Sequence, residues 1–382
     1  MKKKSFLPVI GLTFILCTFL ILSCGKKHDN GNSITIGVIG PFEGDNAHIG
    51  KIIMNSVKLF YDKNKIDGLD IKLVPVDDKS NPSDAVAAVQ TSVANKNIKA
   101  FIGFYNSSTA IACKPIIQEA KVPTLIYSAS NPKVTETAPY YFRMVPTDDN
   151  QAIVLTDYTK QLGAKKVAIL YYADEYGKGL SDGIQKRAKE IGTNIISIQS
   201  YDATTSDFRP VLTVIKGKNP DVVVICGFIE KSIAILNQSA EKGLKCKFLA
   251  GDGTFNEEEL IKGCGTNAEG VYVAAPYVFD EANQKNKEFL ENYWKSYDFK
   301  NERRKPASWS AYAYDAAEII YNALKAGKKD RNSIYEYLGG MNSPEKGFTG
   351  ITGLTYFNEK GNAVGRNFRL AVVHDQHFTA AK

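Results

Sequence analysis

The apolar positions of the chain follow two alternating spacings from residue 34 to residue 275. Short runs rich in β-branched residues, such as Ile34-Thr-Ile-Gly-Val-Ile, indicate buried strands, and the segments between the runs have apolar positions at helical spacing. The other predicted strands span residues 69–76, 100–102, 123–127, 166–171, 195–199, 221–225, 247–250 and 271–275. Strands that alternate with helices are typical of a parallel sheet with helices on both faces.

Several predicted helices begin and end at residues with a clear physical signal. Asn81 and Pro82 start one helix, because asparagine accepts from free N–H groups and proline suits the first helical turn. Ser206 is expected to cap a later helix, and Gly163 and Gly192 are expected to end two others. Further helices are predicted at 52–63, 229–242, 283–298, 306–326 and 331–339.

The alternation restarts near Asp148, and the chain is long enough for two domains. After the second set of strands the chain turns helical, which suggests a return to the first domain, and 368–373 predicts a closing strand. We therefore expect an α/β fold with two doubly wound parallel-sheet (Rossmann-like) lobes, joined by a hinge that the chain crosses several times. Lobe 1 is expected to contain residues 33–147 and 277–366, and lobe 2 residues 148–276 and 367–382.

The N-terminal residues have the pattern of an export signal. A basic start at residues 2–4 precedes an apolar run, 6–22, that is short for a membrane span. Cys24 follows Ser23 at the end of this run, which resembles a bacterial lipobox. We therefore expect residues 1–24 to be a lipoprotein signal peptide with Cys24 as the lipidated residue, and the polar residues 25–33 to be a flexible tether. An ordinary signal peptide or an uncleaved anchor is the alternative.

Charge and cysteine content narrow the class of function. The formal net charge of +7 becomes +4 without the three lysines at 2–4, and no basic cluster is interleaved with aromatic residues, so a nucleic-acid partner is not expected. Cys113 and Cys226 lie in apolar runs and are interpreted as buried thiols. Cys246 and Cys264 flank a short αβ unit, and in an exported protein this pair is a candidate disulfide. No cysteines have zinc-ligand spacing, so no metal site is expected.

The segment from Ile102 to Thr109 is the strongest candidate for a binding site. A predicted strand ends at Gly103, and Ser107, Ser108 and Thr109 open the next helix. Free N–H groups and the positive end of the helix dipole at such a start suit a carboxylate or a phosphate. The alternative is that Ser107 only caps the helix.

Short segments spread along the chain resemble the leucine/isoleucine/valine-binding branch of the type I periplasmic binding proteins. The resemblance extends from about Ile34 to the C-terminus. The segments that carry it begin at Ile36 (IGVIGP), Ile102 (IGFYNSST), Tyr127 (YSASNP), Arg143 (RMVPTD), Glu175 (EYGKGL), Ala240 (AEKGL), Gly251 (GDG) and Trp309 (WSAYAYDA). The resemblance implies the two-lobed fold of that family and a binding function without a cofactor.

The resemblance also implies how the two charges of an amino acid would be held. Ser107 matches a serine whose hydroxyl binds the ligand carboxylate, and Ser108 matches a residue that donates its backbone N–H there. Ser128 matches a residue whose backbone carbonyl accepts a hydrogen bond from the ligand ammonium. Ser130 matches a residue whose hydroxyl binds the same ammonium, and Asp252 matches an acidic residue of the second lobe that pairs with its charge. A zwitterion that leaves water needs both charges compensated, which agrees with this assignment.

Aromatic residues are expected to form the wall around the ligand side chain. Tyr176 and Phe228 match aromatics that the second lobe closes over the ligand, and Phe104 and Tyr105 are expected at the pocket floor. Ile49 stands where some relatives have an aromatic residue. The family resemblance favours a ligand with an aliphatic side chain. The aromatic residues expected in the pocket could also contact a ligand with an aromatic side chain.

The most direct hypothesis is an extracytoplasmic, lipid-anchored protein that delivers an amino acid, branched-chain or otherwise aliphatic, to the permease subunits of an ABC importer. The alternative is a sensor of the same fold, or a binder of amides or aromatic compounds, that serves another receptor. An enzyme is not expected, because no Gly-x-Ser-x-Gly motif surrounds a candidate serine and the glycines near Gly37 lack dinucleotide spacing.

Overall fold

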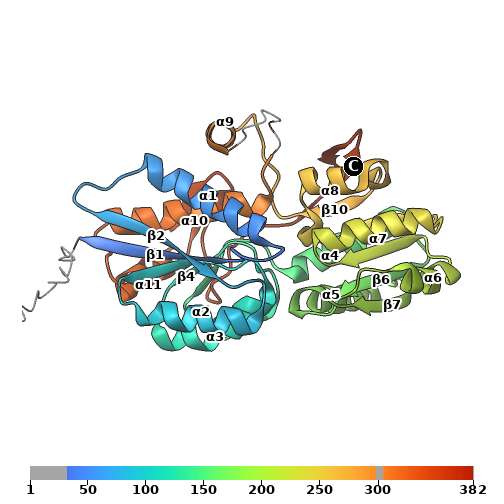
Figure 1. Ribbon diagram of the computed structural model, residues 1–382, viewed down its shortest axis with the longest axis horizontal. Coiled ribbons are helices and arrows are strands. Elements are labelled where there is room, and N and C mark those ends of the chain that lie inside the picture. Colours follow the sequence, from blue (N-terminus) through green and yellow to red (C-terminus); the bar gives the residue numbers. More distant parts are fainter. Residues whose placement is uncertain (1–31, 298–302, 304, 382) are drawn as a thin grey trace, which may run out of the picture.

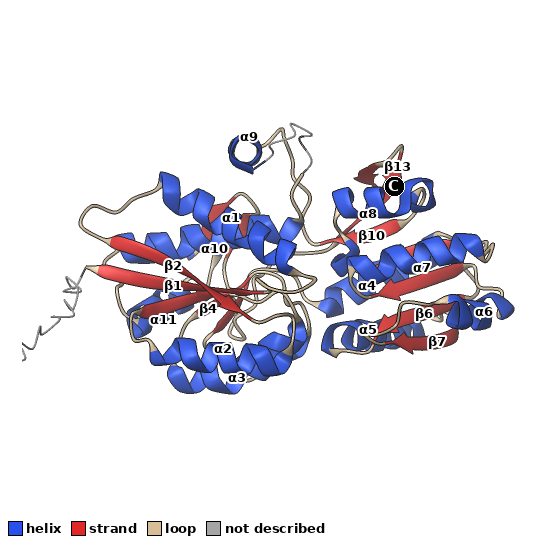
Figure 2. Cartoon of the chain, viewed as in Figure 1, coloured by secondary structure: helices blue, strands red, loops and turns tan. Residues whose placement is uncertain are grey.

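A computed structural model describes residues 32–297, 303 and 305–381. Two α/β lobes lie side by side along the long axis of the molecule (Figure 1). Each lobe has a central sheet covered by helices, as the red and blue elements of Figure 2 show.

The first sheet contains five strands, all parallel to their neighbours. In their order across the sheet they are β2 (Asp70–Asp77), β1 (Ser33–Gly40), β3 (Ile98–Ile102), β4 (Thr124–Ile126) and β5 (Tyr141–Arg143). One face packs against α1 (Ala47–Lys63), α10 (Ser308–Lys325) and α11 (Arg331–Gly340), and the other against α2 (Pro82–Ala94) and α3 (Ser107–Ala120). A buried core therefore lies on each face of the sheet.

The second sheet has seven strands, with an antiparallel extension at one edge. Its order is β14 (His377–Ala380), β13 (Arg369–His374), β10 (Tyr272–Ala275), β9 (Lys247–Ala250), β8 (Val222–Cys226), β6 (Val167–Tyr172) and β7 (Ile195–Tyr201). One face packs against α4 (Asp148–Gln161) and α5 (Glu175–Ile191), and the other against α6 (Arg209–Gly217), α7 (Ile229–Glu241) and α8 (Glu257–Cys264).

Both sheets share one strand order, with the first strand of each lobe between the second and the third. The order β2-β1-β3-β4-β5 in the first sheet corresponds to β7-β6-β8-β9-β10 in the second. Doubly wound sheets bind ligands in the crevice beyond the carboxyl ends of their strands, where this order reverses. Each lobe therefore offers one such crevice.

The chain passes between the lobes three times. It leaves the first sheet after β5, returns after β10 through α9 (Gln284–Tyr297) to α10, and leaves again before β13. Between α11 and this last passage lies a small hairpin of β11 (Phe348–Gly350) and β12 (Gly353–Thr355). The Asn150 Nδ2 donates to Asn367 Oδ1 at 3.0 Å and Phe368 N donates to Asn150 Oδ1 at 2.8 Å, so the first and the last passage are held together.

The α/β class and the parallel sheets predicted from the sequence are confirmed. Three details differ. Helix α1 begins at Ala47, earlier than expected, and Gly50 permits this start because a Cβ there would lie 1.9 Å from the Pro41 carbonyl oxygen. Ser206 does not cap α6, whose N-cap is Phe208. The short strands β5, β11, β12 and β14 were not predicted, because their side chains carry too brief a pattern to distinguish them from loops.

The expected disulfide between Cys246 and Cys264 is wrong, since both are free thiols. The Sγ of Cys264 lies 3.9 Å from the Ile233 carbonyl oxygen on α7, within the core between α7 and α8. Cys246 is half-buried just before β9, where the Val223 backbone hydrogen-bonds to its side chain. The two thiols therefore contact different elements. Burial raises the pKa of Cys246 to about 12 and that of Cys264 to about 11.

Residues 1–31, including Cys24, lie outside the described residues, so the signal peptide, the tether and the lipidation stay predictions. Among the helices that the structure describes, none combines the length and the apolar character that a membrane crossing needs. The lobe boundaries also stay a prediction.

Candidate functional site

A small cavity lies where the carboxyl ends of both sheets meet. Its volume is about 20 Å³. It is lined by Tyr105, Ser107, Ser128, Ser130, Tyr176, Phe228, Asp252, Gly253 and Trp309. These residues follow β3 and β4 in the first sheet and β6, β8 and β9 in the second, with Trp309 added by α10. The structure thus brings together every predicted site residue except Ser108 and Phe104.

The start of α3 forms the first side of the cavity. Ser107 is the first residue of this helix and is only 2 % exposed, and the Asn106 side chain in front of it makes no capping hydrogen bond. Ser107 Oγ accepts from the Asn131 backbone N–H at 3.2 Å, so the hydroxyl is held in place without capping its own helix. A buried hydroxyl therefore lies beside the positive end of a helix dipole.

Ser108 and Phe104 have other surroundings. Ser108 lines a neighbouring groove together with Asp45 and Lys79 and is not among the residues that line the cavity. Phe104 is fully buried in the core between the first sheet and α3, with its ring 6.1 Å from that of Tyr141. The expectation that Phe104 forms the pocket floor is therefore wrong. Its ring packs into the core on one face of the first sheet, whereas Tyr105 belongs to the core on the other face.

The loop after β4 is fixed from behind by Arg143, at the end of β5. This guanidinium is fully buried and donates to the carbonyl oxygens of Ser130 and Asn131 at 2.9 and 2.6 Å and to Asn362 Oδ1. Ser130 O also accepts from the Asp148 backbone N–H at 3.0 Å. Burial lowers the pKa of Arg143 to about 10. Ser130 is thus held rigidly at the cavity edge.

Asp252 enters the cavity from the second lobe, at the start of the short helix η2 (Asp252–Thr254). Its Oδ1 accepts from the Tyr176 hydroxyl at 2.7 Å and from Gln151 Nε2 at 2.9 Å. Gln151 Nε2 also donates to Asp148 Oδ1 at 3.1 Å, so one amide bridges two carboxylates. Burial raises the pKa of both acids, and the charge of Asp252 raises the pKa of Asp148 further. The Arg143 guanidinium favours the charged form of Asp148, whereas a cation in the cavity would compensate Asp252, which lines it.

Aromatic rings close the rest of the cavity. Phe228 has its ring centroid 5.1 Å from that of Tyr176 and 5.8 Å from that of Tyr105, which in turn lies 5.7 Å from Trp309. Gly253 permits this contact, because a Cβ there would lie 2.6 Å from the Gly227 carbonyl oxygen and 3.1 Å from the Phe228 ring. Rings from both lobes therefore meet across the cavity.

Sequence reasoning missed four residues that shape this site. Trp309 lines the cavity, and Gln151, Asp148 and Arg143 orient the residues around it. Arg143, Asp148 and Trp309 lie in segments that carry the family resemblance, so that signal was available for them. Gln151 lies outside those segments, and nothing in the sequence connects it to Asp252.

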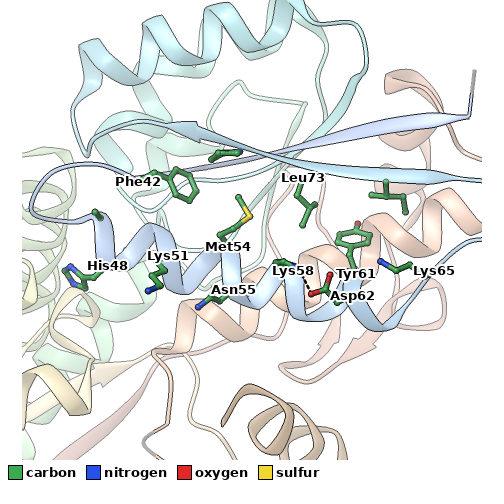
Figure 3. Close-up of a pocket in the computed structure, with 13 residues that line it drawn as sticks. Phe42, His48, Lys51, Met54, Asn55, Lys58, Tyr61, Asp62, Lys65 and Leu73 are labelled. Carbon is green, nitrogen blue, oxygen red and sulfur yellow. Dashed lines mark hydrogen bonds and ion pairs between the residues drawn. The ribbon is translucent and has the colours of Figure 1, made fainter. Parts of the chain in front are cut away.

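A larger groove of about 730 Å³ lies between α1 and β2, within the first lobe (Figure 3). Apolar side chains such as Phe42, Met54 and Leu73 point into it, and the lysines Lys51 and Lys58 lie along its helix. It receives no residue from the second lobe and lies away from the carboxyl ends of the strands of that lobe. The smaller cavity, with polar groups converging from both sheets, is therefore the candidate site.

The fold and the cavity define a class of protein: a two-lobed binding protein that holds a small solute between doubly wound lobes. The chain belongs to the Periplasmic binding protein family, whose sequence profile matches residues 33–377. The Leu/Ile/Val-binding protein homolog 2 of Brucella abortus is 30% identical over 373 residues, which is 95% of this chain and 94% of that protein.

Two solved structures share the fold over most of the chain. The branched-chain amino acid transporter substrate binding protein LivJ of Streptococcus pneumoniae, in complex with isoleucine, has a TM-score of 0.82 and 26% identity, and the match covers 92% of this chain and 99% of that one. An ABC transporter solute binding protein of Rhodopseudomonas palustris BisB5, in complex with 3,4-dihydroxybenzoic acid, has a TM-score of 0.80, 25% identity and coverage of 91% and 96%. The type I periplasmic-binding-protein fold and the resemblance to the Leu/Ile/Val-binding branch are thereby confirmed.

Proposed function

We propose that this protein binds an amino acid with a branched-chain or other aliphatic side chain between its lobes and delivers it to the permease subunits of an ABC importer. One observation carries the proposal: Ser107 at the start of α3 and Asp252 from the second sheet line the same cavity. An anion site and an anionic side chain from opposite lobes match the two ends of an amino-acid zwitterion.

The carboxylate of the ligand is assigned to the first turn of α3. There the Ser107 hydroxyl and the backbone N–H groups of Ser107 and Ser108 would donate to it, and the helix dipole favours its charge. The ammonium is assigned to Asp252, the Ser130 hydroxyl and the Ser128 carbonyl, which together accept its three protons.

The side chain of the ligand is assigned to the space among Tyr105, Tyr176, Phe228 and Trp309. A cavity of about 20 Å³ holds about one water molecule, so the rings must move apart before a ligand enters. Opening about the three chain passages would separate Tyr105 and Trp309 from Tyr176 and Phe228. We propose that residues 33–147 with 277–366, and residues 148–276 with 367–382, move as the two bodies of this hinge.

Two kinds of relative support this ligand class. The Brucella abortus protein, which this chain matches over almost its whole length, is named a Leu/Ile/Val-binding protein homolog. The Streptococcus pneumoniae structure contains isoleucine. The same comparisons support an extracytoplasmic place for the chain. The lipid anchor on Cys24 and the contact with permease subunits belong to the proposal.

An aromatic carboxylic acid is a second candidate ligand. Four aromatic rings line the cavity, and aromatic pairs add about 0.5–1.5 kcal/mol beyond the area they bury. The Rhodopseudomonas palustris protein was solved with 3,4-dihydroxybenzoic acid. Such a ligand lacks an ammonium, however, and would leave the buried Asp252 carboxylate without a cation.

Isothermal titration calorimetry tests the proposal with leucine, isoleucine, valine, phenylalanine and 3,4-dihydroxybenzoate. We expect binding of at least one aliphatic amino acid, and no heat with any amino acid would contradict the proposal. Ser107→Ala should weaken amino-acid binding by about 1.5–3 kcal/mol, the usual contribution of a hydrogen bond to a charged group. Ser108→Ala is the matched control and should bind as the parent does, because Ser108 lines the neighbouring groove and the substitution keeps the backbone N–H that is assigned to the carboxylate.

A further inference from the structure

Three side chains from the two lobes converge at the rim of the cleft. His48 lies in the first turn of α1, in lobe 1, whereas Glu230 lies in the first turn of α7 and Glu259 in α8, both in lobe 2. One ligand atom of each lies within 4.8 Å of the other two. Figure 3 shows His48 at the end of its helix, beside the pale green and yellow ribbons of the second lobe.

The separations suit a single metal ion. His48 Nε2 lies 3.1 Å from Glu259 Oε1. Two ligands of a tetrahedral zinc ion with bonds of about 2.0 Å are separated by about 3.3 Å. Small rotations of the exposed Glu230 side chain would bring the third oxygen to the same separation.

The hydrogen bonds behind these residues orient them as metal ligands. His48 Nδ1 lies 3.2 Å from the Asp45 carbonyl oxygen, which only accepts, so Nδ1 carries a proton. Nε2 faces the Glu259 carboxylate, and it can bind a metal ion there once its own proton has left. Asn256 Nδ2 donates to Glu259 Oε1 at 2.8 Å and steadies that carboxylate. The Nε2 atom is buried and pairs with Glu259 Oε1 at 3.1 Å, so a metal ion would take the place of the proton between them.

The charges around the cluster leave room for a cation. Among the described residues no lysine or arginine forms an ion pair with Glu230 or Glu259. The ammonium of Lys231, the nearest along the chain, donates instead to the carbonyl oxygens of Ala203 and Thr205 at 2.8 Å. The two acids repel each other in this arrangement, and a divalent ion would remove the repulsion.

We propose that His48, Glu230 and Glu259 bind a divalent transition-metal ion, with Zn²⁺ as the best match, and that this ion bridges the two lobes. One imidazole nitrogen and two carboxylates, with water in the fourth position, are ordinary ligands for zinc. The sequence alone did not predict a metal site, because the three ligands are far apart along the chain and have no motif spacing.

The bridging position couples the metal to the ligand. All three residues meet only when the lobes are together, so the ion would bind the closed form and would favour the binding of a solute that also closes the cleft. By thermodynamic linkage the solute would strengthen metal binding by the same factor. This coupling rests on the proposed function, whereas the metal site itself does not.

Titration of the purified protein, without a polyhistidine tag, with ZnCl₂ tests the site. We expect one bound ion, with its affinity weakened at least about tenfold by each of His48→Gln, Glu230→Gln and Glu259→Gln, since even loss of a partner behind a ligand costs 10–100-fold. His374→Gln is the matched control, because His374 pairs with Glu269 at 3.2 Å within one lobe. Absence of binding, or an affinity that His48→Gln leaves unchanged, would overturn the site.

Leucine titrations with and without saturating Zn²⁺ test the bridge. We expect Zn²⁺ to tighten leucine binding at least about fivefold in the parent protein and to have no effect in His48→Gln. Equal leucine affinity with and without a bound ion would overturn the bridge. If neither leucine nor another amino acid binds, the proposed function fails, and the titration with Zn²⁺ alone still decides the metal site.

Discussion

Asp252 is the side chain on which the proposed ligand chemistry depends most. It receives hydrogen bonds from Tyr176 and Gln151, and it has no cationic partner among the described residues. A buried carboxylate of this kind costs free energy unless a cation compensates it. The hydroxyl and the amide hold its orientation, and the ligand ammonium would supply the charge.

Replacing Asp252 by alanine should therefore weaken amino-acid binding strongly. Truncation of one partner of a buried charge pair typically costs about 2–5 kcal/mol, because the other charge is left unpaired. Calorimetry with the best amino-acid ligand measures the loss. Asp149→Ala, at an exposed position beside Asp148, is the control and should change the affinity little. Parent-like binding by Asp252→Ala would show that the cavity is not the ligand site.

Asp78 is a second buried acid, and it should make stability depend on pH. Its carboxylate accepts from Ser80 N at 3.0 Å and from Thr109 Oγ1 at 3.2 Å, and burial raises its pKa from 3.8 to about 6. The folded state therefore holds this proton more tightly than the unfolded state. The stabilisation is complete below pH 3.8 and is lost as the pH rises through 6.

Asp78→Asn removes this titration while it keeps the shape of the side chain. Relative to the parent, the variant should gain up to about 3 kcal/mol in the free energy of unfolding between pH 4 and pH 7, from a pKa shift of about two units. Urea unfolding at the two pH values gives the difference. A stability difference that is the same at both would contradict the assignment.

At the scale of elements, the helix starts around the cleft differ in how they are capped. The Asn81 side chain accepts from the N–H groups of Ser83 and Asp84 at the start of α2, at 2.8 and 3.2 Å. The starts of α3 and α7, which face the cleft, have no such side-chain cap. The start of α3 therefore keeps backbone donors that no N-cap side chain occupies, and these donors are free for a ligand.

Asn81→Ala should lower the free energy of unfolding by about 0.5–2 kcal/mol, the usual cost of losing an N-cap. Thr147→Ala is the matched control, because Thr147 stands at the N-cap of α4 without a side-chain capping hydrogen bond. Thermal or urea unfolding compares the two variants. An equal decrease in the free energy of unfolding for both variants would show that the capping hydrogen bonds of the Asn81 side chain do not stabilise the protein.

At the scale of the whole molecule, the lobes also contact each other on the side opposite His48. Lys133 Nζ, in the first lobe, lies 3.0 Å from Glu175 Oε2 in the second, and the Asn131 side chain donates to the Glu175 carbonyl oxygen. Gly179 on α5 permits this approach, because a Cβ there would lie 2.4 Å from Asn131 Nδ2. The close contact between the lobes at this point thus depends on the absence of a side chain at Gly179.

Gly179→Val should hold the lobes apart and weaken ligand binding, at least about tenfold, since closure brings Asp252 and Ser107 together. Small-angle X-ray scattering with the ligand present should show a larger radius of gyration than for the parent. Gly217→Val is the matched control, because nothing lies within 4 Å of a Cβ at the end of α6. Equal affinity and equal size for Gly179→Val would contradict a hinge that closes here.

Local patterns in the sequence predicted most of the strands and helices, because strand and helix periods and the residues that cap helices act over a few neighbours. They also pointed to Ser107, a serine at a predicted helix start, whereas Asp252 was predicted only from the family resemblance. The missed strands β5, β11, β12 and β14 are too short to show a period.

The tertiary structure decided which of these residues meet. The sequence does not distinguish Phe104 from Tyr105, yet one ring fills the core and the other lines the cavity. Gln151 bridges Asp148 to Asp252, 101 residues further along than itself, and His48 reaches Glu259 from the other lobe. Such contacts depend on how two sheets and a hinge place distant segments, and a single sequence records the composition of those segments but not the distances between them.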